Sequence, residues 1–122
     1  MKMILPFIIF FLIFSYIYPT ELKLPDGSIF TGNLRDGLFH GFGKQTWLNG
    51  DFYEGYYKDG MFHGFGVVAS KTYKYTGEFV KGTFEGEGNI FYSCGGSYKG
   101  NFKNGLYHGF GTLVFCKILT AK

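Results

Sequence analysis

Three histidines recur at one point of a repeated pattern, and they are the first candidates for chemistry. His40, His63 and His108 each precede a Gly-x-Gly triplet. Imidazole is a common zinc ligand and general base. Equivalent points in successive β-hairpins lie about 10 Å apart, whereas zinc ligand atoms lie about 2 Å from one ion. We therefore expect no metal site, and we interpret these histidines as repeat residues hydrogen-bonded to local backbone.

The remaining candidates for catalysis are also weak. Glu85 takes the histidine position in the third repeat and Glu87 follows two residues later. No acid or base partner is marked for them, so we interpret both as surface carboxylates. Gly43-Lys44-Gln45 lacks the Ser/Thr and the upstream glycine of a phosphate-binding loop. We expect no catalytic residue, no cofactor and no enzyme activity.

Two cysteines, Cys94 and Cys116, lie one repeat apart. In a regular stack of hairpins that separation corresponds to two strand spacings, about 10 Å. A disulfide requires Cα atoms within about 7 Å. The spacing therefore predicts two free thiols.

The three histidines and the two glutamates belong to a fourteen-residue pattern, aromatic-x-Gly-x-x-x-x-Gly-x-x-His/Glu-Gly-x-Gly. It starts at Phe30, Tyr53, Tyr75 and Tyr98, in steps of 23, 22 and 23 residues. A fixed step of this size indicates a stack of similar small units. We assign a structural role to the repeated positions of the second and fourth units, namely Tyr53, Gly55, Gly60, His63, Gly64, Gly66, Tyr98, Gly100, Gly105, His108, Gly109 and Gly111.

Each unit is typical of a β-hairpin. Asp59-Gly60 occupies a turn position that Asp36-Gly37, Lys81-Gly82 and Asn104-Gly105 share, and such pairs are strong hairpin signals. A second set of turns separates the units, which predicts a meander of about eight short antiparallel strands. Tyr53, Gly55 and Tyr57 share one face of a strand. We expect the glycines between the aromatic residues, and both glycines of each Gly-x-Gly, to form slots for a ring or a neighbouring backbone.

The pattern resembles the MORN (membrane occupation and recognition nexus) repeat from about Phe30 to Phe115, with small MORN-only proteins as the nearer resemblance. It implies an all-β, elongated antiparallel meander of about four MORN hairpin repeats. It also implies a non-catalytic interaction module or scaffold that binds a protein partner, with a membrane surface as a further target. The alternatives are an accessory fragment of a MORN-containing enzyme and an adaptor that binds anionic lipid.

The N-terminus differs in kind. Lys2 precedes an apolar run from Ile4 to Tyr18, which is typical of a secretory signal peptide forming a hydrophobic helix within residues 1–19. We expect a capping strand and turn in 20–29 and four repeats in 30–122. A cleaved signal predicts the secretory pathway. An uncleaved membrane anchor and an unusual N-terminus on a cytoplasmic protein remain open.

Charge and the C-terminus suggest partners. A formal net charge of +3 is too small to indicate nucleic acid. Arg35, Lys58 and Lys103 precede the hairpin turns, either as a lipid-facing basic edge or as solvated turn residues. The apolar segment Thr112 to Leu119 predicts an outer edge strand that pairs with a partner or in a homodimer. The alternative is a tail that folds back.

Overall fold

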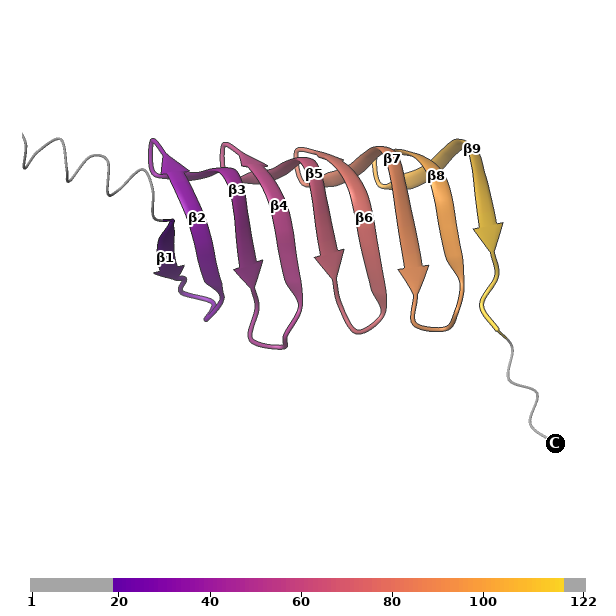
Figure 1. Cartoon of the computed structure of the whole chain (residues 1–122), viewed down its shortest axis with the longest axis horizontal. Helices are drawn as coiled ribbons and strands as arrows, with labels where there is room; N and C mark the ends of the chain where they lie inside the picture. Colours follow the sequence, from indigo (N-terminus) through magenta and orange to yellow (C-terminus); the bar gives the residue numbers. More distant parts are fainter. Residues whose placement is uncertain (1–18, 118–122) are drawn as a thin grey trace, which may run out of the picture.

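Nine antiparallel strands form one elongated sheet, and their order in the sheet equals their order in the chain (Figure 1). The computed structural model describes residues 19–117. The first strand, the predicted cap, adds one strand to the expected eight. The strands are β1 Thr20–Lys23, β2 Ile29–Arg35, β3 Leu38–Thr46, β4 Phe52–Lys58, β5 Met61–Ala69, β6 Tyr73–Val80, β7 Thr83–Tyr92, β8 Ser97–Lys103 and β9 Leu106–Val114.

Each repeat closes at a tight two-residue turn. Asp59 and Gly60 have φ angles of 51° and 81°, and the other three units have the same pair of positive angles. This is the type I′ geometry that suits the twist of a hairpin, and it confirms the predicted turns. The Gly60 N–H donates to the Phe39 carbonyl at 3.0 Å, and the turn glycines at 82 and 105 repeat the bond. The tips of the second, third and fourth hairpins are therefore each hydrogen-bonded to the repeat before them.

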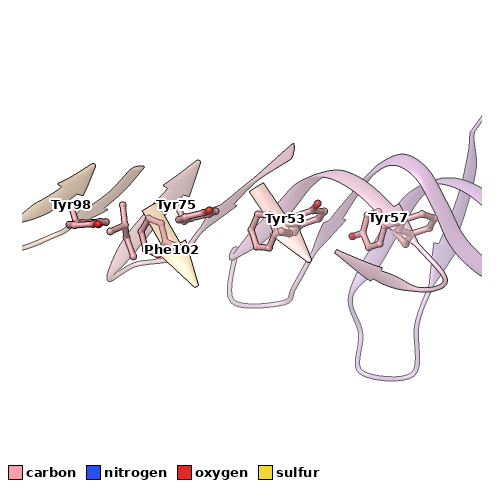
Figure 2. Packing of buried hydrophobic residues seen from close by; sticks show 8 residues of the cluster. Tyr53, Tyr57, Tyr75, Tyr98 and Phe102 are labelled. Atoms are coloured by element: carbon pink, nitrogen blue, oxygen red, sulfur yellow. The ribbon is translucent and has the colours of Figure 1, made fainter. Parts of the chain in front are cut away.

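The core is a ladder of aromatic rings on one face of the sheet (Figure 2). The ring of Tyr53 stacks on Phe62 from the return strand with centroids 3.7 Å apart. It meets Tyr57 edge-on at 5.1 Å, and Phe79 of the next repeat at 5.3 Å. Tyr75 repeats this arrangement with its own neighbours. The rings thus connect each repeat to the next along the sheet, and this continuous row takes the place of one compact core.

The two glycines of each Gly-x-Gly have different structural roles. A Cβ on Gly66 would lie 2.6 Å from Cε2 of Tyr53, so this position forms the predicted slot beneath the ring. Gly64 has φ of +77° and only ordinary contact with Tyr56. Its positive φ accompanies a bulge, because Gly55 pairs with Gly66 while Tyr57 already pairs with Phe62. The slot interpretation was therefore wrong for Gly64.

Cys94 and Cys116 form a disulfide with Cα atoms 5.1 Å apart, so the prediction of free thiols was wrong. Cys94 lies in the β7–β8 turn, and Cys116 follows the end of β9. The Lys117 N–H also donates to the Cys94 carbonyl at 3.1 Å. A turn residue lies between its two strands, so Cys94 is about one and a half strand spacings from β9, not two. The chain beyond Val114 then bends toward the turn and brings Cys116 within bonding distance.

Both ends of the sheet follow the sequence prediction in part. β1 pairs with β2 in the predicted capping position. β9 is the outer strand, but it ends at Val114, and the chain then runs toward the β7–β8 turn where Cys116 is bonded. The predicted strand residues 118–119 and nearly all of the predicted N-terminal helix lie outside the described residues. Within 19–117, no helix is long and apolar enough to cross a membrane.

Candidate interaction surface

The face of the sheet opposite the ring ladder, here called the outer face, carries a row of exposed phenylalanines. Side chains alternate between faces along a strand, so the middle residue of each Gly-x-Gly points away from the rings. Phe42 and Phe65 are each 55% exposed, and Phe110 is 92% exposed. Glu87 takes the same position in the third repeat. Exposed apolar side chains that gather on one face of a protein mark candidate interaction sites.

The N-terminal half of the outer face carries aromatic side chains beside one ion pair. Tyr56 packs edge-on against Phe42, with ring centroids 5.5 Å apart. Lys44 lies over the ring of Phe52, 4.7 Å from its centroid, and pairs with Glu54 at 3.7 Å. These contacts fix the positions of the aromatic and charged side chains on this part of the surface.

The C-terminal half carries a shallow groove of about 850 Å³ across β5 to β9. Phe65 and Phe110 stand at its ends, and Glu87 lies between them. Backbone at Gly77, Gly88, Gly100 and Gly111 contributes to the lining, together with the polar side chains of Thr76, Asn89, Lys99 and Thr112. The volume falls within the range of binding pockets, about 300–1,000 Å³.

Glu78 borders this groove. A Cβ on Gly86 would collide with the Glu78 carboxylate, so that carboxylate lies beside the strand that carries Glu87. Among residues 19–117, the one ion pair is Lys44–Glu54. Glu78 and Glu87 therefore have no cationic partner within 4.0 Å in this part of the chain.

The residues at the histidine position are dispersed along the sheet. His40, His63 and His108 lie on three different hairpins, and nowhere in 19–117 do three potential metal ligands gather. Nδ1 of His40 is buried without a hydrogen-bond partner, so the predicted bond to local backbone was wrong for this residue. The backbone of His40 itself pairs with Asn33 in the strand ladder. Glu85, at the same repeat position, accepts from the Asn104 N–H at 2.9 Å.

The tyrosine hydroxyls also serve the fold. Tyr53 donates to the Tyr56 carbonyl at 2.6 Å, and Tyr75 donates to the Glu78 carbonyl at 2.8 Å. Burial, with a smaller effect of Glu78, raises the pKa of Tyr75 to about 12. Burial raises the pKa of Tyr57 still further, and its hydroxyl is buried without a partner. Both hydroxyls therefore stay neutral to a higher pH than an ordinary tyrosine, whose pKa is about 10.

The predicted basic residues lie along one edge of the sheet. Arg35, Lys58 and Lys103 end β2, β4 and β8 at the hairpin tips, and all three are exposed. Asp36 and Asp59 directly follow the first two. The structure thus brings the basic side chains to one edge, where adjacent carboxylates offset part of their charge.

Comparison with known families agrees with this architecture. The MORN repeat family matches residues 30–52, 53–70, 75–93 and 98–117. The chain belongs to the MORN repeat family, whose repeats generally act as modules for protein or lipid interaction. A search of curated proteins finds no match.

The sequence analysis did not single out the outer-face phenylalanines as candidate binding residues. The signal was present, because Phe42, Phe65 and Phe110 share one position in the repeat. Strand alternation from Gly66 would have placed its neighbour Phe65 on the opposite face from the rings.

Proposed function

We propose that this chain is a non-catalytic interaction module that binds a protein partner through the outer face of its sheet. The observation that carries the proposal is the row of exposed phenylalanines, Phe42, Phe65 and Phe110. Exposed aromatic residues surrounded by polar side chains are the usual composition of a protein interface. The groove between the second and third of these rings offers a recessed surface beside them.

A finer resemblance agrees with an adaptor role. The stretch Met61 to Gly66, followed by Tyr75-Thr76-Gly77, resembles the small MORN repeat-containing protein 2. That resemblance rests on the residues alone, and it implies a short adaptor without an attached catalytic domain. The alternative of an accessory fragment of a MORN-containing enzyme has no side chains in 19–117 that favour it.

Binding to anionic lipid is the second candidate, and the basic edge motivates it. Each basic residue near an anionic surface contributes about 1 kcal/mol. Four basic residues, the fourth being Lys81, face two aspartates at the hairpin tips, so the edge has a net charge of +2 (four minus two). That is a weak attraction in physiological salt, so we favour the protein partner.

The disulfide supports a place in the secretory pathway. Disulfides persist in oxidising compartments and are rare in the cytosol, and residues 1–19 have the composition of a signal peptide. A cytoplasmic or membrane-anchored protein is the alternative. The location of a C-terminally tagged copy, with the thiols of Cys94 and Cys116 tested by alkylation, distinguishes these possibilities. Cytosolic tag with two labelled thiols contradicts the secretory assignment.

The experiment for the function compares wild type with the double variant Phe65→Ser/Phe110→Ser. Both are assayed for cross-linked protein partners in native extracts and for flotation with vesicles containing phosphatidylserine. The control is Leu48→Ser, which removes another exposed apolar side chain but lies in the β3–β4 turn. We expect the double variant alone to lose its partners. Unchanged partners in the double variant, or flotation of wild type without any cross-linked partner, contradict the protein-binding proposal.

A further inference from the structure

The groove interrupts the aromatic row at a single position. Three repeats place a phenylalanine there, while the third repeat places Glu87. Phe65 and Phe110 are thus two repeats apart, and a carboxylate replaces the ring between them. The groove is the space that a third ring would partly fill.

The charge beside this row is negative and unpaired. Glu78 projects beside Gly86 from the neighbouring strand, close to the position of Glu87. Lys99 is the one cation lining the groove, and it lies in the adjacent row, opposite Asn89 rather than Glu87. A ligand that follows the phenylalanine row therefore meets apolar surface, then the two carboxylates and the amide of Asn101 opposite Glu87, then apolar surface.

The spacing of this row fits a helix. One repeat comprises two strands and advances about 10 Å along the sheet. Seven residues of an α-helix advance about 10.5 Å, so side chains seven apart on one helix face match successive repeats. A fully extended strand needs about three residues for the same distance, which turns the next side chain to the opposite face.

We propose that the groove binds an α-helical segment of a partner protein that places a lysine or arginine against Glu87 and Glu78. Apolar side chains about seven residues before and after it pack on Phe65 and Phe110. Charge-assisted hydrogen bonds to a carboxylate are stronger than neutral ones. The basic residue supplies specificity, while the phenylalanines supply buried area. This inference rests on the proposed protein-binding function.

The test is selection of a phage-displayed library of random peptides of about 20 residues, long enough for a helix to span Phe65 to Phe110. Wild type, Glu87→Phe and Glu87→Lys serve as targets. Glu87→Phe restores the residue of the other three repeats, so it should keep the fold, which thermal melting verifies. The control Glu21→Lys reverses an exposed charge on β1, away from the groove.

We expect wild type and Glu21→Lys to enrich peptides with a basic residue between two apolar ones, about seven positions away on each side. Glu87→Lys should bind these peptides at least about tenfold more weakly, a loss of about 1.4 kcal/mol. Glu87→Phe should lose the preference for a basic residue.

Enrichment of peptides without basic residues, or equal affinity for Glu87→Lys, overturns the inference, as does no enrichment on wild type. These outcomes are separable from failure of the proposed function. Loss of natural partners in Phe65→Ser/Phe110→Ser, together with their retention in Glu87→Lys, leaves the protein-binding function standing and rejects only the basic helix.

Discussion

A methyl group at Gly66 tests the ring ladder directly. In Gly66→Ala the new Cβ would lie 2.6 Å from Cε2 of Tyr53, whereas ordinary contacts begin at 3.4 Å. The ring must therefore move by about 0.8 Å, the difference between these two distances. It has little freedom to do so, because Phe62 stacks on its other face at 3.7 Å and its hydroxyl is bonded to the Tyr56 carbonyl.

The expected cost follows from that confinement. Overpacking of a filled site costs about 1–3 kcal/mol, and the substitution recovers about 0.4–1 kcal/mol because alanine restricts the unfolded chain. We expect the free energy of unfolding to fall by about 1.3 kcal/mol, the difference between the midpoints of these two ranges. For a sheet of this size that lowers Tm by roughly 5–10 °C. Urea unfolding monitored by circular dichroism measures the change.

The matched control is Gly64→Ala on the same strand. Gly64 has φ of +77°, and a Cβ added there would lie 3.6 Å from Tyr56, an ordinary contact, so the cost of Gly64→Ala is backbone strain alone. Combining each change with Tyr53→Leu separates the two causes, because the ring is then absent. We expect the Gly66 cost to shrink and the Gly64 cost to persist. Equal coupling at both sites, or wild-type stability of Gly66→Ala, refutes the slot.

Tyr57→Phe should raise the free energy of unfolding by about 1 kcal/mol, because it removes a buried hydroxyl without a partner; a loss measured by urea unfolding contradicts this. Cys116→Ser should remove about 3 kcal/mol, because the disulfide to Cys94 closes a loop across 22 residues in the unfolded chain. If Cys116→Ser melts at the wild-type Tm without reductant, the disulfide between Cys94 and Cys116 is contradicted. Stability should hold up to about pH 10 and fall toward pH 12. Burial raises the pKa of Tyr75 to about 12, so the unfolded chain ionises first and gains stability relative to the fold; a flat alkaline melting profile excludes this. The exposed edge β9 should form dimers in sedimentation that dissociate in Val114→Pro, whereas a monomer at high micromolar concentration rules out edge pairing.

Most of the architecture could be predicted from the sequence, because the turns of this chain contain dipeptides that are typical of turns. Asp59-Gly60 and its equivalents need two positive φ angles, and few other dipeptides accept them. The order of strands then follows from short connections, since each strand can only pair with its neighbour. The capping strand was also predictable, because Glu21 and its neighbours precede a separate turn.

Other features depend on three-dimensional detail that spacing does not contain. Gly64 and Gly66 look alike in the repeat, but one adopts a positive φ and the other lies beneath a ring. The disulfide was missed because equal sequence positions were assumed to be two strands apart. Cys94 lies in a turn, where the end of the chain passes at a shorter distance. The groove required the combined placement of residues from five strands.

The ring ladder makes the length of the molecule proportional to its number of repeats. Each ring of the ladder contacts rings of its own repeat and of the adjacent repeats only, so no contact depends on the total number of units. A duplicated copy inserted between the second and third repeats would extend the sheet by about 10 Å without disturbing the other junctions. The distance between two partners bound at its ends can thus be set by copy number, one repeat at a time.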